Sequence, residues 1–521
     1  MRISTSQFYE STAANYQKNF AKVVKSSEEA SSLVRINTAA DDPVGASRLL
    51  QLGNQASMLS QYETNVSTIK ATLGTTEAVM TSISNVLQRA KELAVSAGNA
   101  GYTDSDRKSV ASELGSIEDQ LLSLMNTKDE NGKYIFAGSK GDVVPFTRNG
   151  DGSYSYNGDQ MTLDLPVGDT MSMATNSTGW EVFQQAINTS RTQVTMTAPA
   201  VDDGRVVLTN GQVSSAVTYN SQFRSGEPYT VEFTSGTQLK ITDSSGNDVT
   251  AEASQGGVIT PNTQAGQNVN FRGVDLTLNV NLKSGDVAGA VLPGRTFTLA
   301  AKPDTFTVAR SPGNSTATQI TGSQITDPVA YHSSFPTGSA VLKFTSATDF
   351  ELYAAPLTSS SQVISSGTLA GNVATASGVS FTLNGAPAAN DQFSIAVNTH
   401  ETQNILDTVN QLKTALSTPI EGDAIAGQKM LAALASGIGN LASGTDQLTS
   451  GLSSVGGRGQ ALDTQADTNH SFVLANSQTQ SAIRDSDPAE VMTRLTLQQT
   501  MLQASQLAFS KITQLGLFNK I

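Results

Sequence analysis

Apolar residues at helical spacing occupy both ends of this chain, and a long stretch rich in Gly, Ser and Thr separates the two ends. In the N-terminal part, heptad a and d positions run from Leu52 to Ala97, and only Gln55 and Thr76 depart from the apolar pattern. A repeat sustained over six heptads is typical of a coiled-coil seam. At ~1.5 Å of rise per residue, the pattern predicts a helical rod of roughly 70 Å.

A second, shorter stripe runs from Val110 to Leu124, after a break at Gly98-Asn99-Ala100-Gly101. Thr103 is placed to cap this helix ahead of Asp104. We expect the two helices to fold back on each other as a hairpin.

The C-terminal side has a similar pattern in the reverse order. A short stripe from Ile405 to Leu416 stops at Pro419, and a longer one keeps its register from Leu431 to Ile483. The unbroken register predicts a helix that passes through Gly456-Gly457-Arg458-Gly459, although each interior Gly costs ~1 kcal/mol against Ala. A phosphate-binding glycine loop would follow a strand, and no strand pattern precedes this one. We therefore expect these glycines to serve helix packing.

The two terminal segments carry stripes of their own. The turn Asp41-Asp42-Pro43 ends the first segment, and Asp485-Ser486-Asp487-Pro488 caps the start of the second. A module of ~30 residues is too small to bury a core alone. We expect the two segments to pair with each other or with neighbouring molecules; the plainer alternative is two amphipathic helices packed on the body. The striped positions are Tyr9, Ala13, Tyr16, Phe20, Val23 and Ala30, then Val491, Leu495, Gln498, Leu502, Ser505, Phe509 and Ile512.

The middle of the chain is predicted to be β-rich. After residue 141, aromatic residues alternate with Gly/Asp/Asn turns, and a short helical stretch follows around Trp180. An internal repeat then predicts two tandem β domains, each with enough strands to close a sandwich or barrel. The first copy carries an extra stretch near Asn279 to Arg295. The matched segments are Tyr219 with Tyr331, Phe233-Thr234-Ser235 with Phe344-Thr345-Ser346, Gly273-Val274 with Gly378-Val379, and Asp304-Thr305-Phe306 with Asp391-Gln392-Phe393.

The sequence gives only weak evidence for a catalytic or metal-binding site. The three histidines lie in different regions, and His400-Glu401 begins a zinc-protease motif that fails because Asn404 stands where the second His must be. Asp243-Ser244-Ser245-Gly246-Asn247-Asp248 lacks the ligand spacing of a calcium loop and is interpreted as a hairpin turn. We expect a protein that is not an enzyme, with no catalytic residues, no cofactor and no metal.

Composition narrows the range of partners. The chain has no cysteine, so no disulfide or metal-thiolate site is available. Its net charge is −13 without a Lys/Arg cluster, which disfavours binding to nucleic acid or to an anionic membrane. No apolar run approaches ~18 residues, and the first ten residues lack a basic-then-apolar start, so neither a membrane helix nor a cleavable secretory signal is expected.

Two long motifs resemble those of the bacterial flagellin superfamily. The run from Leu33 to Gly45 (LVRINTAADDPVG) resembles its N-terminal signature, and the run from Ile483 to Gln499 resembles its C-terminal partner. Three further stretches favour the hook-filament junction branch over filament flagellins: MRIST at 1–5, KYIFAGS at 133–139 and LGLFNKI at 515–521. The resemblance covers roughly residues 1–185 and 401–521.

Two positions depart from the usual junction-protein pattern. Leu497 stands where Asn is common, and Lys520 stands where Tyr is common. Neither departure changes the resemblance, but Lys520 makes the extreme C-terminus a poor place to carry family contacts over.

The resemblance implies an α+β multidomain fold in which the N- and C-terminal segments combine into a long antiparallel coiled-coil helical bundle, with all-β domains inserted between them. The terminal helices would form an inner axial core, the rods the next shell, and the tandem β domains the outer surface. The implied domains are 1–45 with 485–521 (terminal helices), 46–140 with 401–484 (helical rod), 141–200 (β-hairpin region with a short helix), 201–310 (β repeat 1) and 311–400 (β repeat 2).

The implied function is that of a structural junction subunit between flagellar hook and filament. Such a subunit forms a homo-oligomeric ring, contacts hook-associated protein one and flagellin, meets an export chaperone, and leaves the cell through the flagellar type III system without a cleaved signal. A filament flagellin and a secreted adhesin with a helical stalk and β head are the alternatives. The expected assembly-interface residues are Tyr9, Tyr16, Phe20, Val23, Arg35, Asn37, Asp41, Asp42, Pro43, Arg484, Asp485, Leu495, Leu502, Phe509 and Ile512.

Overall fold

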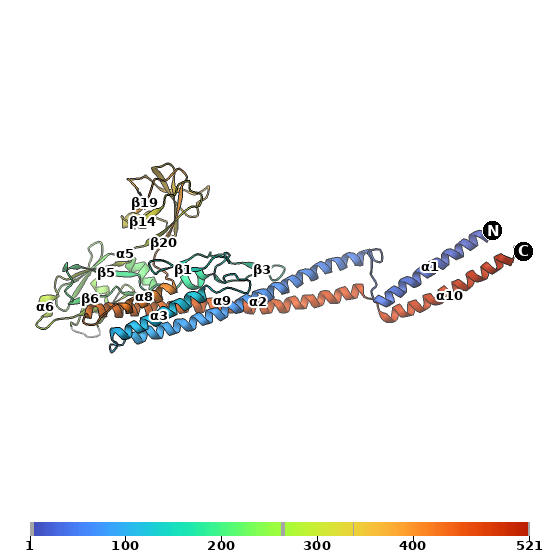
Figure 1. Cartoon of the computed structure of the whole chain (residues 1–521), viewed down its shortest axis with the longest axis horizontal. Helices are drawn as coiled ribbons and strands as arrows, with labels where there is room; N and C mark the ends of the chain where they lie inside the picture. The colour runs from blue at the N-terminus through green and yellow to red at the C-terminus, as the bar shows by residue number, and fades with distance from the viewer. Residues whose placement is uncertain (1–4, 262–265, 337, 519–521) are drawn as a thin grey trace. The chain divides into compact units, whose positions relative to one another are not determined.

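The computed structural model describes residues 5–261, 266–336 and 338–518 (Figure 1). The chain divides into two compact units. Unit 1 comprises Met1–Gly74, Leu163–Thr175 and Gly456–Ile521, and unit 2 comprises Thr75–Thr162 and Asn176–Val455.

Unit 1 is built from four helical segments: α1 (Thr5–Ser32), the first part of α2 (Pro43–Ala97), the last part of α9 (Ala424–Arg484) and α10 (Pro488–Phe518). Two contacts set the direction of α2 against α9. The Asn476 side chain donates to the Leu52 carbonyl at 3.1 Å, and Lys70 pairs with Asp463 at 2.5 Å. Since the residue numbers rise along one helix as they fall along the other, the two helices run antiparallel here.

A small β hairpin packs on this helix pair. Its strands are β3 (Asp164–Pro166) and β4 (Ser172–Ala174). Asn65 of α2 donates to the carbonyl of Pro166 at 2.7 Å, and Asn469 of α9 donates to that of Val167 at 2.9 Å. Asn469 is buried, and this bond satisfies a side-chain donor that would otherwise be costly to bury.

The helical part of unit 2 contains the rest of α2, α3 (Asp104–Met125), α8 (Ile405–Ser417) and the first part of α9. Thr103 caps α3 as predicted: its hydroxyl accepts from the Asp106 amide, and the Asp106 carboxylate accepts from the Thr103 amide.

Most predicted seam positions of α2 are buried, namely Leu59, Val66, Ile69 and Leu73 in unit 1 and Met80, Ile83, Leu87, Ala90, Ala94 and Ala97 in unit 2.

The glycine cluster of α9 is helical, as the register predicts. A Cβ added to Gly456, Gly457 or Gly459 would meet no atom of this chain within 4 Å among the described residues. We expected these three glycines to serve helix packing, but the described residues of this chain include no packing partner for them. Close packing occurs at other glycines of α9, such as Gly437, where an added Cβ would lie 2.5 Å from Leu412 Cγ.

Residues 141–190 form short elements around an aromatic cluster. An antiparallel hairpin pairs β1 (Phe146–Arg148) with β2 (Tyr154–Tyr156), and a π-helical turn covers Trp180–Gln184. The ring of Phe146 lies 5.1 Å from that of Tyr156 and 5.8 Å from that of Phe183. This cluster buries Phe146 and Phe183 completely or nearly so.

The first β domain has two sheets over one core. One sheet has the order β5-β12-β8-β9 and the other β10-β11-β6, with β7 also paired to β11. Aromatic residues including Tyr219, Tyr229 and Phe271 fill the space between them. The strands are β5 (Thr192–Ala198), β6 (Val206–Leu208), β7 (Gln212–Val213), β8 (Tyr229–Phe233), β9 (Leu239–Thr242), β10 (Gln267–Phe271), β11 (Val274–Val280) and β12 (Thr296–Ala301).

The second β domain repeats this arrangement, with an added edge strand, β17, and without a counterpart of β7. Its sheets have the orders β13-β20-β15-β16-β17 and β14-β19-β18. The strands are β13 (Thr305–Arg310), β14 (Ile320–Ile325), β15 (Ser339–Phe344), β16 (Asp349–Ala354), β17 (Val363–Thr368), β18 (Val373–Ala376), β19 (Val379–Leu383) and β20 (Gln392–Asn398).

One glycine turn is the same in both domains. Gly273 before β11 and Gly378 before β19 have φ of +80° and +77°. A Cβ on Gly273 would lie 2.8 Å from the Ser215 carbonyl, and one on Gly378 would collide with the carbonyl of Asp327. Only glycine fits this backbone without strain, so the repeated Gly-Val pair reflects a structural requirement.

One segment of the sequence repeat was matched wrongly. Asp304-Thr305-Phe306 enters β13, which occupies the sheet position of β5, whereas Asp391-Gln392-Phe393 enters β20, which occupies the position of β12. The segments share Asp and Phe because both begin a strand whose aromatic residue packs on the core of the second β domain. β5 also lies before residue 201, in the stretch assigned to the hairpin region, yet it pairs with β12 of the first β domain.

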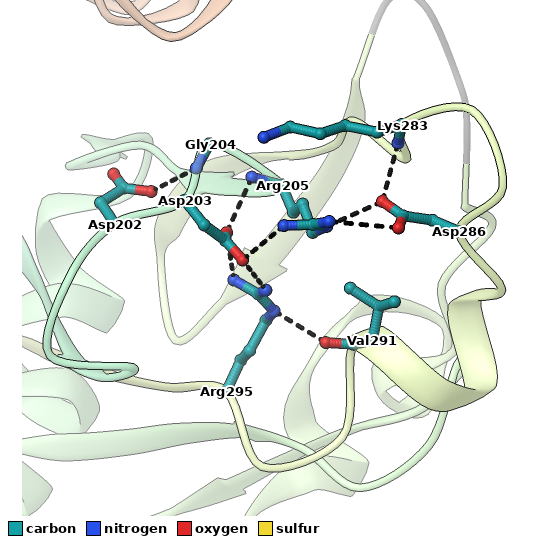
Figure 2. Close-up of polar contacts among 8 residues, drawn as sticks. All are labelled: Asp202, Asp203, Gly204, Arg205, Lys283, Asp286, Val291 and Arg295. Atoms are coloured by element: carbon teal, nitrogen blue, oxygen red, sulfur yellow. Dashed lines mark hydrogen bonds and ion pairs between the residues drawn. The ribbon is translucent and has the colours of Figure 1, made fainter.

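Figure 2 shows how the extra stretch of the first domain is fastened. Arg205 bridges Asp286 at 2.7 Å and Asp203 at 2.9 Å, and Arg295 donates to Asp203 at 2.8 Å. The hydrogen bonds from Arg295, together with those from Arg205, hold the pKa of the Asp203 carboxyl well below its ordinary value. Both carboxylates that contact an arginine, Asp203 and Asp286, have their hydrogen-bond partners within the cluster. The cluster therefore has a structural role: it holds the inserted loop in place.

Candidate assembly interface

The predicted stripes of the two terminal helices face each other within unit 1. Figure 1 shows α1 and α10 side by side, and the rings of Tyr16 and Phe509 stack with centroids 6.2 Å apart. The Asn19 side chain donates to the Ser505 hydroxyl at 2.7 Å. Val491 at the start of α10 is only 2% exposed. Tyr16, Ser505 and Phe509 of the predicted stripes therefore lie on one seam, whereas Phe20 of the same stripe is exposed.

A polar latch closes the base of this seam. Glu29 of α1 accepts a hydrogen bond from the Ser486 hydroxyl at 2.6 Å and pairs with Arg494 of α10. Burial raises the pKa of Glu29, but the hydrogen bonds from Ser486 and Arg494 outweigh it and hold that pKa below its ordinary value. The sequence reasoning missed Glu29 and Arg494, because nothing in either helix alone marks their pairing.

The two signature motifs bind each other directly. The Arg35 amide donates to the Arg484 carbonyl at 2.7 Å, and the Arg35 guanidinium donates to the Ile483 carbonyl at 2.8 Å. The Ser486 amide donates to the Leu33 carbonyl at 2.9 Å, beside an antiparallel bridge between Val34 and Asp485. Three predicted residues, Arg35, Arg484 and Asp485, thus meet at one point.

The acidic turn fixes the bend between α1 and α2. Asp41 accepts from Lys25 Nζ at 2.6 Å and from the amides of Thr38 and Asn37 at 2.9 and 3.2 Å. The hydrogen bond from Lys25, followed by those from Thr38, holds the pKa of the Asp41 carboxyl well below its ordinary value. The turn is therefore a bonded, preformed structure.

The next residues of the turn start α2. Asp42 accepts from the Gly45 amide at 2.9 Å as the cap, and Pro43 is the first helical residue. A Cβ on Gly45 would lie 2.6 Å from both Asp42 and Ile36. A side chain at this position would disrupt both the cap and the buried Ile36.

A groove of about 460 Å³ lies between α1 and the turn that follows it. Four predicted interface residues line it: Phe20, Arg35, Asn37 and Asp41. The ring of Phe20 is 52% exposed, although it is large and apolar. The groove is a concave surface on unit 1 lined by both apolar and charged side chains.

Exposed apolar side chains continue along the terminal helices. Met492, Leu497, Met501 and Leu507 of α10 are each more than half exposed. Large apolar side chains exposed on a helix in this way are candidates for contacts with another molecule. The pairing of α1 with α10 therefore leaves apolar area uncovered.

The remaining predicted residues take ordinary places in these elements. Val23, Leu495 and Leu502 are half-buried, and Pro43 is exposed. The side chains of Tyr9 and Ile512 lie outside the described residues, as does Lys520.

The geometry of the described residues gives little support to a membrane helix or a metal site. The described helices include none that is long and apolar enough to cross a membrane. Within the described ranges, no three acidic or histidine side chains gather as metal ligands. Asp243 accepts from the amides of Ser245 and Asn247 at 3.0 and 2.8 Å, so its carboxylate is used in the predicted hairpin turn.

Comparisons with known proteins support the sequence resemblance. Residues 3–141 match the family model of the bacterial flagellin N-terminal helical region. The chain is 33% identical over 183 residues to flagellar hook-associated protein 3 of Salmonella typhimurium (strain LT2), covering 35% of this chain and 57% of that protein. It is 31% identical over 210 residues to flagellar hook-associated protein 3 of Escherichia coli (strain K12), covering 40% of this chain and 63% of that protein.

The chain thus spans less than two thirds of the length of these two relatives. The crystal structure of flagellar hook associated protein-3 from Legionella pneumophila shares the fold, with a TM-score of 0.52 and 18% identity over 83% of this chain and 98% of that one. The N-terminal region of this chain is similar to that of bacterial flagellins, and the resemblance to the flagellin superfamily that the terminal motifs predict is confirmed.

Proposed function

We propose that this protein is a structural junction subunit of the bacterial flagellum, which joins the hook, through hook-associated protein one, to the flagellin filament. The observation that carries the proposal is the direct bonding of the two signature motifs beside a groove that exposes Phe20. The similarity to flagellar hook-associated protein 3 of two bacteria supports the same role. The protein acts by assembly and is not an enzyme.

The interface consists of two parts in this proposal. The first is the α1/α10 seam with its latch, which holds the two termini of one subunit together. The second is the groove and the exposed apolar side of α10, which neighbouring subunits cover in a ring. Burial of apolar area stabilises association by roughly 25 cal/mol per Å². The seam residues are already paired within one chain. The exposed groups therefore make the contacts between neighbouring subunits of the ring.

The antiparallel contacts of α2 with α9 support a coiled coil along the predicted seam. The heptad pattern and the buried a and d positions agree with that arrangement. The subunit is exported through the flagellar type III system with the help of a chaperone, and its place is outside the cell at the junction.

The test is a single substitution in the groove. Phe20→Asp places a carboxylate on an exposed ring position and leaves the seam residues unchanged. We expect secretion of a folded monomer, together with release of unpolymerised flagellin and loss of swimming. Gln17→Asp, an exposed position one turn away on the same helix, introduces the same charge and should leave swimming intact.

Two results would contradict the proposal. Full motility of the Phe20→Asp strain would show that the groove is not an interface. Electron microscopy of the purified protein separates the main alternative, since a filament flagellin would polymerise alone into long tubes.

A further inference from the structure

A second cavity lies in unit 2, between the first β domain and the start of α9. Its volume is about 670 Å³, within the ~300–1,000 Å³ of small-molecule sites. None of the interface residues discussed above lines it. The cavity is therefore separate from the candidate assembly interface.

One wall is the outer face of the sheet β10-β11-β6. Side chains alternate along β11, so Leu276 and Leu278 enter the core while Asp275, Thr277 and Asn279 point to the cavity. Asn268 of β10 joins them on this wall. Apart from the Asp275 carboxylate, which only accepts, the wall thus presents amide and hydroxyl groups, which can both donate and accept hydrogen bonds.

The opposite wall is the first turns of α9, where small residues leave room. Ala432, Ala435, Ser436 and Gly437 line it. Asn281 and Gln428 exchange reciprocal amide hydrogen bonds of 3.2 Å between sheet and helix. The buried amide of Asn440 accepts from the Thr189 amide at 2.7 Å farther along α9. These contacts hold the walls apart at a fixed spacing.

Two lysines give the cavity its charge. Lys302 and Lys429 line it, and neither makes an ion pair with another residue of the described ranges. Burial lowers the pKa of Lys302, which is the expected response of an ammonium group that has no carboxylate beside it. The Asp275 carboxylate accepts from its cross-strand neighbour Asn270 on the same sheet. A negatively charged group would satisfy Lys302.

Asn279 adds the second recognition element. It is only 6% exposed, and no side-chain hydrogen bond joins it to another described residue. Because Asn279 lines the cavity, a ligand hydroxyl group that met its side-chain amide would gain hydrogen bonds there.

From these contacts we propose that the cavity binds an acidic saccharide, whose carboxylate meets Lys302 and Lys429 and whose hydroxyl groups meet Asn279 and the neighbouring amides. The ligand's carboxylate supplies the missing countercharge, and its ring hydroxyls match a wall of mixed donors and acceptors. This activity is separate from the assembly role and does not depend on it.

The experiment is calorimetric titration of the full-length secreted protein with digalacturonic acid at low ionic strength. We expect saturable binding that weakens at least tenfold in Lys302→Met, which keeps the aliphatic stem and removes the charge. Lys429→Glu, at an exposed position on the rim, should also weaken binding and cannot disturb the core. Lys240→Gln, an exposed lysine of β9 outside the cavity, is the matched control and should bind as the parent protein does.

Maltose and inorganic phosphate serve as the comparison probes. Binding of digalacturonic acid that exceeds both supports the proposal. If phosphate bound as tightly as digalacturonic acid, the cavity would be a simple anion site. If maltose bound as tightly, the two lysines would contribute nothing to binding. Either result overturns the proposal, as does unchanged affinity in Lys429→Glu, whether or not Lys302→Met folds.

Discussion

The backbone amide of Arg35 donates to the carbonyl of Arg484 at 2.7 Å, although the two residues come from opposite ends of the sequence. The Arg35 guanidinium adds a bond to the Ile483 carbonyl at 2.8 Å. Because both termini contribute to the same joint, removing either terminal segment would leave backbone groups of the other without these hydrogen-bond partners. This joint makes the terminal pair a single structural element.

The seam of that element can be tested at Leu502, which is half-buried on the stripe that includes Phe509. Leu502→Asp puts a carboxylate among apolar neighbours, and an unpaired charge in such a place costs several kcal/mol. We expect a soluble secreted monomer with normal far-ultraviolet circular dichroism for unit 2, and cells that shed flagellin and do not swim. Lys511→Asp, at an exposed position, should be far milder. Swimming at the parental rate would mean that the stripe faces solvent.

A second prediction concerns Asp407 of α8. Burial raises the pKa of Asp407 to about 6, even though the Tyr154 amide donates to it at 2.9 Å. The folded protein then holds this proton more tightly than the unfolded chain, whose reference pKa is 3.8. Stability from this group is greatest below pH 4 and falls as the pH rises to about 6. Asp407→Asn should therefore stabilise the protein at pH 7.5, by about 3 kcal/mol at most.

The measurement is urea unfolding followed by the fluorescence of Trp180, the only tryptophan in the chain. The advantage of Asp407→Asn should shrink towards zero near pH 4. Asp119→Asn, an exposed carboxylate of α3, is the control and should change stability little. An advantage that is equal at both pH values would rule out the titration of Asp407 as its cause.

A third prediction separates two kinds of glycine in α9. Gly457→Ala adds a methyl group where no atom of the chain lies within 4 Å, so helix propensity alone should stabilise the monomer by ~1 kcal/mol. Gly437→Ala should destabilise it, because the new methyl group would lie 2.5 Å from Leu412 Cγ, and Leu412 is buried. Thermal unfolding followed at 222 nm compares the two. A loss of stability in Gly457→Ala would reveal a packing partner for that glycine.

A fourth prediction follows from the place where the β domains leave the helical part. The Asn188 amide donates to the Glu401 carbonyl and the Gln403 amide to the Ala186 carbonyl, both at 2.9 Å. The chain can therefore be joined across these positions by a short Gly-Gly linker after deletion of residues 190–400. We expect the shortened protein to be secreted and to support filament growth, measured as swimming in a deletion strain. Failure of secretion or of filament growth would assign the β domains a part in assembly.

Much of the helical architecture could be predicted from the sequence, because each signal is local. The heptad positions of α2, the Thr103 capping box and the passage of α9 through its glycines all depend on residues within a few turns. The β repeat was visible for the same reason, through the Gly273 and Gly378 turns.

The parts that could not be predicted depend on residues distant in sequence. The pairing of Glu29 with Arg494 needs the register of α1 on α10, and that register is a property of both helices together. The strand equivalence of β13 with β5 is set by sheet order, which similar strand-start residues cannot reveal. The stripe positions of the interface were identified from helical spacing and the motif residues by resemblance, whereas the individual bonds between them are visible only in the three-dimensional structure.

The central claim, a structural role at the junction of hook and filament, is tested most directly by immunogold electron microscopy of isolated flagella with antibody against this protein. The account predicts a single narrow band of label at the boundary between hook and filament. Label distributed along the whole filament, or absent from flagella altogether, would contradict it.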